Sequence, residues 1–267
     1  LALSTPPSPS ERLIRSSLLP NLCKAVARNE RYYGDFAIFE TAQVFHDTDY
    51  TTPYDPREKL PSQRKNVAGA FVSAGKDVAA LFRKAKGVVE MMPRYTHMER
   101  YDFRQVEKPV WADEVVWLNI YLGEERIGDL ALLSKRVSMA CGIKNVNVML
   151  FQLDQDALVP LRSRTNTFTH LAEYPMTDYD ISLLLDGEVK WADVAETIEG
   201  VKNPLLHGAS FVDEYRGKQV PAGKKSLTAR LTIGSTEKTL TSAEIEEVAN
   251  SVLKKLSKRF GAELRSR

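Results

Sequence analysis

The sequence contains few of the residues that build metal sites or disulfide frameworks. Its 267 residues include two cysteines and four histidines. Cys23 and Cys141 lie far apart and form no C-x-x-C motif, and the histidines are scattered along the chain. This usage excludes a zinc site and a disulfide scaffold. We therefore expect no metal ligands and two reduced thiols, as in a cytoplasmic protein.

Long apolar runs and a large excess of one charge are also missing. No stretch approaches the roughly 20 apolar residues that span a bilayer, so a membrane role is excluded. The 37 Lys and Arg residues against 35 Asp and Glu leave a net charge of +2. Any nucleic-acid contact must therefore come from a local patch. The first residues include no Met and no signal peptide, so we expect a segment cut from a longer chain.

Catalytic motifs are absent as well. The chain has no GxGxxG, GxxxxGK[ST], HExxH or GxSxG pattern. Its carboxylates show no spacing that singles out a general acid and base. We predict no catalytic residue, no bound cofactor and no chemistry by this chain alone.

The first half of the chain mixes strand and helix patterns. Phe36–Phe45 is β-prone and mostly apolar, which predicts a buried strand, and residues 47–64 form a polar loop rich in Pro and Asp. Apolar residues at helical spacing predict a helix over Asp77–Met92. The other predicted elements are a helix after Pro20, strands at 67–74, 115–122, 126–133 and 146–153, and a short helix at 135–141. This order favours an α+β domain.

The last hundred residues show a clearer order. We place the boundary in the unpatterned stretch 161–169, between domains at 1–165 and 168–267. Strands are predicted at 181–185, 209–216, 226–233 and 262–265, with a helix at 191–199. A second helix begins at the capping box made by Thr241 and Glu244. The resulting β-α-β-β-α-β order is the ferredoxin-like pattern, in which two helices cover one face of the sheet.

The uncovered face of that sheet carries the candidate site. By alternation, Phe211, Asp213 and Tyr215 share one face, while Thr228 and Arg230 point away from the helices. An aromatic ring, a carboxylate and an arginine on an open sheet can stack on and hydrogen-bond to unpaired bases. The segment 216–230 adds a local cationic patch without any acid: Arg216, Lys218, Lys224, Lys225 and Arg230. Packing and solvation explain the same residues without RNA, so both interpretations stay open at this point.

Several longer stretches resemble a known family. FVDEYRGKQVPAGKKSLTARLTI, KTLTSAEIEEV and KRFGAELR resemble the ferredoxin-fold anticodon-binding domain of the bacterial phenylalanyl-tRNA synthetase beta subunit. LIRSSLLPNL and FAIFETAQVF resemble earlier segments of that subunit, in the right order. The resemblance covers nearly the whole chain, which would be about the C-terminal third of the subunit.

The resemblance implies a role for each half. The first would be a class II synthetase-like core without catalysis, since Phe103-Arg104-Gln105-Val106-Glu107 misplaces the acid of motif 2 and motif 3 is missing. ATP and Mg would be used by the whole ligase through its alpha subunit, in a cytoplasmic heterotetramer of two alpha and two beta subunits. The second half would bind the anticodon of tRNA-Phe, with Asp213 and Tyr215 on the bases and the five cations as further contacts.

One departure and one alternative accompany this interpretation. Asp178 and Tyr179 stand where the family usually has two arginines, while Asp180 is retained. A phosphate contact made by those arginines in relatives is therefore in doubt here. The alternative function is a ferredoxin-like protein-interaction or regulatory module without RNA binding, and an independent enzyme is the least favoured.

Overall fold

The computed structural model describes residues 2–9, 12–46, 61–159 and 174–265. The chain divides into two compact units, Leu1–Thr167 and Phe168–Arg267, and each is described by itself. The segment 161–169, in which we placed the domain boundary, lies outside the described residues. Within the described part of the chain, no helix is long and apolar enough to cross a membrane.

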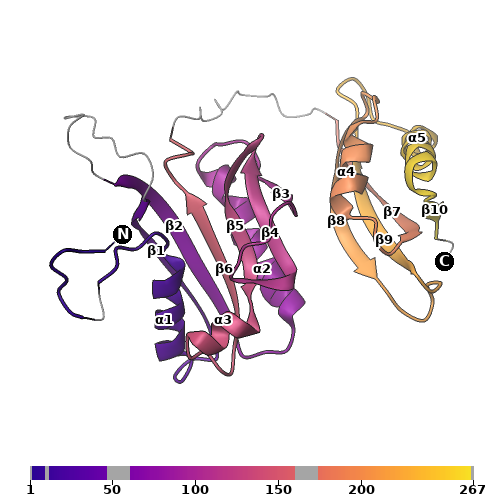
Figure 1. Ribbon diagram of the computed structural model, residues 1–267. Coiled ribbons are helices and arrows are strands. Elements are labelled where there is room, and N and C mark those ends of the chain that lie inside the picture. The colour runs from indigo at the N-terminus through magenta and orange to yellow at the C-terminus, as the bar shows by residue number, and fades with distance from the viewer. Residues whose placement is uncertain (1, 10–11, 47–60, 160–173, 266–267) are drawn as a thin grey trace. The chain divides into compact units, whose positions relative to one another are not determined.

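The first unit is built on a six-stranded antiparallel sheet with the order β1-β2-β6-β5-β4-β3 (Figure 1). The strands are β1 (Asp35–His46), β2 (Ser62–Ser73), β3 (Asp102–Arg104), β4 (Ala112–Leu122), β5 (Glu125–Leu133) and β6 (Asn147–Asp154). The helices are α1 (Leu19–Asn29), α2 (Val78–Tyr95) and α3 (Lys135–Ala140).

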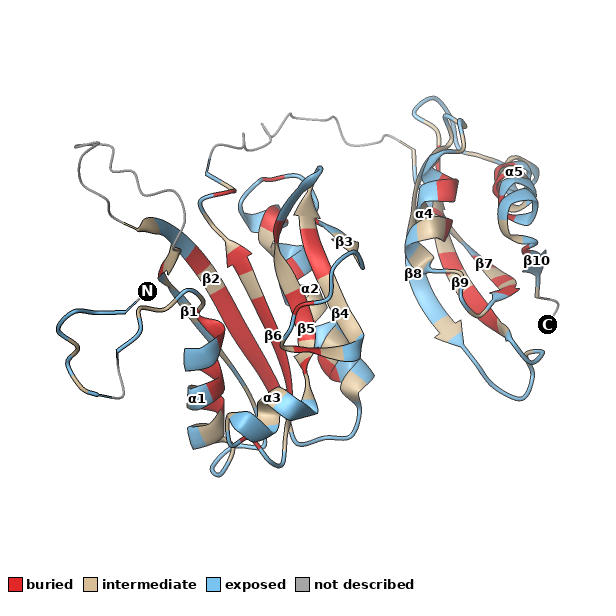
Figure 2. Ribbon diagram, viewed as in Figure 1, coloured by how far each residue is buried: buried red, intermediate tan, exposed pale blue. Residues whose placement is uncertain are grey.

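Both faces of the central strands of this sheet are covered. Along β2 and β6, successive side chains enter two different cores, because neighbouring residues of a strand point to opposite faces. Ala70 and Leu150 belong to a core with α1, whereas Phe71 and Phe151 belong to a core with α2. Figure 2 shows β2 and β6 as largely buried strands. The central strands therefore have no face left for a ligand.

Two expectations for this unit need correction, and one strand was not expected. The strand at 36–45 forms as β1, but it is an edge strand whose outer face is exposed, and Phe39 is 78% accessible. An edge strand has a neighbour on one side only, so an apolar run does not ensure burial. β2 begins at Ser62, inside the loop predicted for 47–64, of which residues 47–60 lie outside the described chain. The short strand β3 was not predicted.

Two helices of the first unit, α2 and α3, begin at residues whose side chains cap them. The Asp77 side chain accepts a hydrogen bond from the Ala80 amide at 2.8 Å and so satisfies one of the free amides at the start of α2. α2 then continues to Tyr95, past the predicted end at Met92, and carries Pro93 in its last turn.

Cys23 and Cys141 are both free, and burial together with the neighbouring Cys141 thiol raises the pKa of Cys23 to about 12.

The second unit has a four-stranded antiparallel sheet with the order β10-β7-β9-β8. Its elements are β7 (Thr177–Asp186), α4 (Trp191–Glu199), β8 (Leu206–Tyr215), β9 (Lys224–Ile233), α5 (Ser242–Phe260) and β10 (Glu263–Leu264). The β-α-β-β-α-β order is thereby confirmed. The capping box is also present, since the Thr241 hydroxyl and the Glu244 carboxylate each meet the other residue's amide.

Both helices of this unit pack on one face of the sheet. Val194 and Ile198 of α4, together with Val248 and Val252 of α5, form one core with the apolar residues of β7 and β9. The core residues of the strands alternate along the chain: Ile181, Leu183, Leu185, Leu227, Ala229, Leu231 and Ile233. The residues between them must therefore point to the other face.

Candidate nucleic-acid interface

The face of the second sheet that lacks helices is called the open face here. Its members follow from the pairing register, because residues directly opposite each other on antiparallel strands share a face. They are Asp178, Asp180, Ser182, Leu184, Asp186, Gly208, Ser210, Asp213, Tyr215, Lys224, Ser226, Thr228, Arg230 and Thr232. Most are small and polar, and the hydroxyls of Ser182 and Thr228 lie 3.0 Å apart in a hydrogen bond. Ser226 is buried, but the other polar residues are at least partly accessible and offer donors and acceptors along three adjacent strands.

A β-bulge in β8 changes which aromatic residue reaches the open face. Phe211 lies opposite Ala229, and Asp213 lies opposite the next residue back, Thr228, so Val212 is an extra residue. Phe211 therefore points to the helix side, where its ring meets Trp191 edge to face at a centroid distance of 5.8 Å. The expectation that Phe211 shares a face with Asp213 and Tyr215 is wrong, and the bulge is the reason. Asp213 and Tyr215 do share the open face.

Tyr215 lies at the end of β8 and is 41% accessible. Its ring folds over Gly217, where a Cβ atom would come within 2.3 Å of the Tyr215 hydroxyl oxygen. The Arg265 guanidinium lies 5.5 Å from the ring centroid and donates to Gln219 Oε1 at 3.0 Å. Gly217 and Arg265 thus fix the position of the Tyr215 ring. Sequence reasoning missed Arg265, which follows the last strand and reaches this ring only in the folded unit.

Asp213 lies beside Tyr215 on the open face and is exposed. One of its carboxylate oxygens, Oδ1, accepts a hydrogen bond from the Glu214 amide at 2.8 Å. This local bond orients the carboxylate at the bulge. Its other oxygen, Oδ2, has no partner in the described residues and can accept a hydrogen bond from a ligand.

Arg230, at the middle of β9, is already paired. It donates to both oxygens of Asp180, at 2.7 and 2.9 Å, and lies 3.9 Å from Asp178. The hydrogen bonds and the charge of Asp180 raise the pKa of Arg230, and those from Arg230 lower the pKa of Asp180. Two carboxylates therefore face one guanidinium at this end of the open face. The second carboxylate, Asp178, makes this region less favourable for phosphate.

The remaining predicted cations differ in their surroundings. The prediction that Lys225 contacts RNA needs correction. Lys225 points to the same side as buried Leu227, is only 4% accessible, and donates to Glu214 Oε2 at 2.7 Å. Arg216 binds Glu214 Oε1 and the Gly187 carbonyl, both at 2.8 Å. Burial alone would raise the pKa of Glu214, but the hydrogen bonds from Lys225 and Arg216 outweigh it and lower the pKa. Lys218 and Lys224 form no ion pair among the described residues, so their charges are available.

In the first unit, Arg104 of the segment 103–107 is surrounded by other groups of the protein. Arg104 donates to Glu124 at 3.1 Å and to the Gly123 carbonyl at 3.0 Å, and it lies over the Tyr121 ring. Its guanidinium is therefore occupied by the protein's own groups. The described residues also include no cluster of three or more side chains that could hold a metal ion.

Comparison with known proteins places both units. Residues 1–155 match the family described as phenylalanyl tRNA synthetase beta chain CLM domain. The chain belongs to this family. Residues 172–265 match the ferredoxin-fold anticodon binding domain. The two matches confirm the resemblance to the beta subunit and the α+β fold class that it implied.

Individual relatives of this beta chain family agree. The phenylalanine–tRNA ligase beta subunit of Carboxydothermus hydrogenoformans is 29% identical over all of this chain and 33% of its own length. That of Oceanobacillus iheyensis is 28% identical with the same coverage, and that of a Synechococcus strain is 30% identical over 99% of this chain and 33% of its own length. The chain thus spans about a third of the curated relatives it matches. Among solved structures, a pyrrolysyl tRNA synthetase of Desulfitobacterium hafniense aligns with 54% of this chain and 48% of its own, at 12% identity and a TM-score of 0.43.

Proposed function

We propose that this chain is the C-terminal part of a phenylalanyl-tRNA synthetase beta subunit that binds the tRNA-Phe anticodon on the open face. The observation that carries the proposal is the bare, polar sheet face, which holds an exposed tyrosine and an oriented carboxylate two residues apart. A base can stack on the aromatic ring, while the carboxylate accepts from a base edge. Asp213 and Tyr215 are the proposed base contacts.

The cations divide into two groups in this proposal. Lys218, Lys224 and Arg216 lie on or beside the loop that follows Tyr215, and they are proposed to meet the phosphates of the anticodon loop. Arg230 is a weaker candidate because its guanidinium is paired with Asp180. Lys225 leaves the proposed set because it is buried against Glu214.

The first unit is proposed to be a scaffold for the alpha subunit within a heterotetramer of two alpha and two beta subunits. Both faces of its central strands are covered, and Arg104 is held by Glu124, so this arginine is not available to hold ATP. ATP and Mg are proposed to bind the alpha subunit. Purified chain should therefore show no ATP–pyrophosphate exchange with phenylalanine, and robust exchange by the chain alone would refute this division of labour.

Anticodon recognition is tested by comparing two tRNA transcripts. One is tRNA-Phe and the other differs only in the three anticodon bases. The wild-type chain should bind the first more tightly, and Gly217→Ala, which displaces the Tyr215 ring, should reduce that preference. Equal affinity of the wild-type chain for both transcripts at low salt would favour a protein-interaction module instead.

A further inference from the structure

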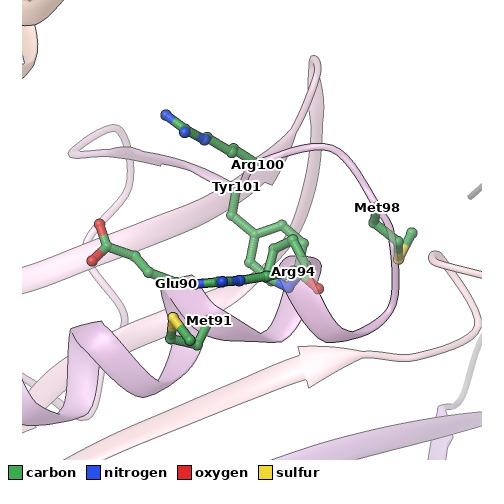
Figure 3. Close-up of a pocket in the computed structure, with 7 residues that line it drawn as sticks. Glu90, Met91, Arg94, Met98, Arg100 and Tyr101 are labelled. Carbon is green, nitrogen blue, oxygen red and sulfur yellow. The ribbon is translucent and has the colours of Figure 1, made fainter. Parts of the chain in front are cut away.

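A hollow of about 520 Å³ lies at the end of α2 in the first unit, far along the chain from the open face. We call it the α2 cavity. Its volume falls within the range of about 300–1,000 Å³ that is typical of small-molecule sites. Figure 3 shows Arg100 on one side of the opening and Glu90 and Arg94 on the other. The other lining residues include Met91, Met98 and Tyr101.

The backbone after α2 creates this cavity by reversing direction. The Thr96 amide donates to the Met92 carbonyl at 3.1 Å, and the Met98 amide donates to the Pro93 carbonyl at 2.9 Å. Between them, His97 adopts a left-handed conformation with φ of 55°, which is the usual way to end a helix in this motif. The chain then returns past the last turns of α2, so Arg100 and Tyr101 come to lie opposite Glu90 and Arg94.

Three donor groups at the cavity have no partner in the described part of the chain. These are the guanidinium groups of Arg94 and Arg100 and the hydroxyl of Tyr101. Tyr101 is only 7% accessible, and its burial raises the pKa of the phenol, so the hydroxyl stays protonated at neutral pH. Tyr101 is the buried member of this donor set, and buried polar groups are normally hydrogen-bonded. Arg94 and Arg100 are exposed at the rim of the cavity, where their guanidinium groups can reach a ligand rich in acceptors.

The other lining groups define the rest of the ligand. Met91 and Met98 present polarizable, adaptable side chains that pack well against flat aromatic rings. Glu90 is paired with Lys86 through one oxygen, Oε1, which leaves the other free to accept from an amino group. Two arginines match the geometry of a phosphate, since each guanidinium can donate two parallel hydrogen bonds.

We propose that the α2 cavity binds a nucleoside phosphate, with the phosphate between Arg94 and Arg100 and the base against Met91 and Met98. Tyr101 donates to the ligand, and Glu90 accepts from an exocyclic amino group of the base. A free nucleotide and an unpaired nucleotide of an RNA present the same chemistry. The site does not depend on the open face, so it stands or fails separately from anticodon binding.

The first experiment titrates the full chain with AMP by calorimetry, with adenosine and inorganic phosphate as partial ligands. AMP should bind saturably and more tightly than either partial ligand. The double variant Arg94→Gln/Arg100→Gln should weaken AMP binding by about tenfold or more, because it removes charge-assisted hydrogen bonds. The matched control is Arg83→Gln/Lys84→Gln, which removes the same charge from an earlier turn of α2 and should change the affinity less than about twofold.

The outcomes decide two questions: whether the site exists, and whether its ligand is a free nucleotide or part of an RNA. Stronger competition by a short single-stranded RNA than by AMP identifies an RNA nucleotide, and the reverse identifies a free nucleotide; both support the site. No saturable AMP binding overturns the proposal. Equal affinity for inorganic phosphate and AMP, or equal weakening in the control variant, also overturns it, because bulk charge then explains the binding. Circular dichroism of both variants verifies that they are folded.

Discussion

The two sheets of this protein differ in how many of their faces are covered. The six-stranded sheet of the first unit has apolar side chains and helices on both faces of its central strands, whereas the four-stranded sheet of the second has helices on one face only. The consequence is visible in composition: β6 carries buried apolar residues at successive positions, while β9 alternates apolar with polar ones. A covered sheet stabilises its unit, and a half-covered sheet leaves one polar face exposed.

The largest expected effect tests this comparison within the second sheet. Leu183→Ala removes a fully buried side chain from the helix side and should lower the free energy of unfolding by about 2–5 kcal/mol. Thr228→Ala, on the open face, removes one hydroxyl hydrogen bond and should cost about 0.5–1.5 kcal/mol. Hydrogen exchange of the β9 amides in the full chain measures both. Equal destabilisation by the two changes would mean that the two faces do not differ as described.

The second prediction separates the two aromatic residues of β8. Tyr215→Ala should weaken tRNA-Phe binding by about 1–3 kcal/mol, the value of one lost base stack. Phe211→Ala is the matched control four residues earlier: it should leave RNA affinity unchanged and cost about 0.5–1.5 kcal/mol of stability through the lost contact with Trp191. Filter binding and urea unfolding measure the two quantities. Unchanged affinity in Tyr215→Ala would remove this residue from the proposed site.

The difference between Tyr215 and Phe211 also shows where sequence reasoning ends. The letters FVDEY alternate cleanly, and nothing in them marks Val212 as an extra residue. The bulge is a property of the pairing with β9, so only the folded register places Phe211 on the helix side. Arg265 was missed for a similar reason, because its contact with Tyr215 joins the residue after the last strand to the end of β8.

Other parts of the fold could be predicted from the sequence because they depend on residues close together in the chain. The capping box at Thr241 and the alternation of β9 each depend on neighbours in sequence, and together they helped to predict the open face. The burial of Lys225 could also have been predicted. Lys225 stands two residues before Leu227, so the same alternation places it on the helix side. The edge position of β1 could not be predicted in this way, because it depends on which strands pair.

The third prediction concerns the acidic end of the open face. Asp178→Asn removes a carboxylate that faces the proposed RNA surface and should raise tRNA affinity by about twofold at low salt, as one unit charge at ~10 Å in water is worth about 0.4 kcal/mol. The gain should shrink at high salt, where such interactions are screened. Glu247→Gln on α5, on the helix side, removes an equal charge and should give a smaller gain. An equal gain from Glu247→Gln would show that only net charge matters.

The smallest expected effect is a pH dependence at the ion pair of the open face. Hydrogen bonds from Arg230 lower the pKa of Asp180 in the folded state, so the pair contributes stability above the unfolded pKa of about 3.9. That contribution is lost as the pH falls through the folded pKa, when Asp180 takes up a proton.

Urea unfolding should therefore show Asp180→Asn less stable than wild type by a constant amount between about pH 5 and 8. The amount should be small, because the pair is exposed. The difference should decrease below about pH 4. Asp186→Asn, on the same strand and without an ion pair among the described residues, provides the matched control. A difference in Asp180→Asn that persists unchanged at the lowest pH would mean that the pair's hydrogen-bond geometry, rather than its charge, holds these two strands together.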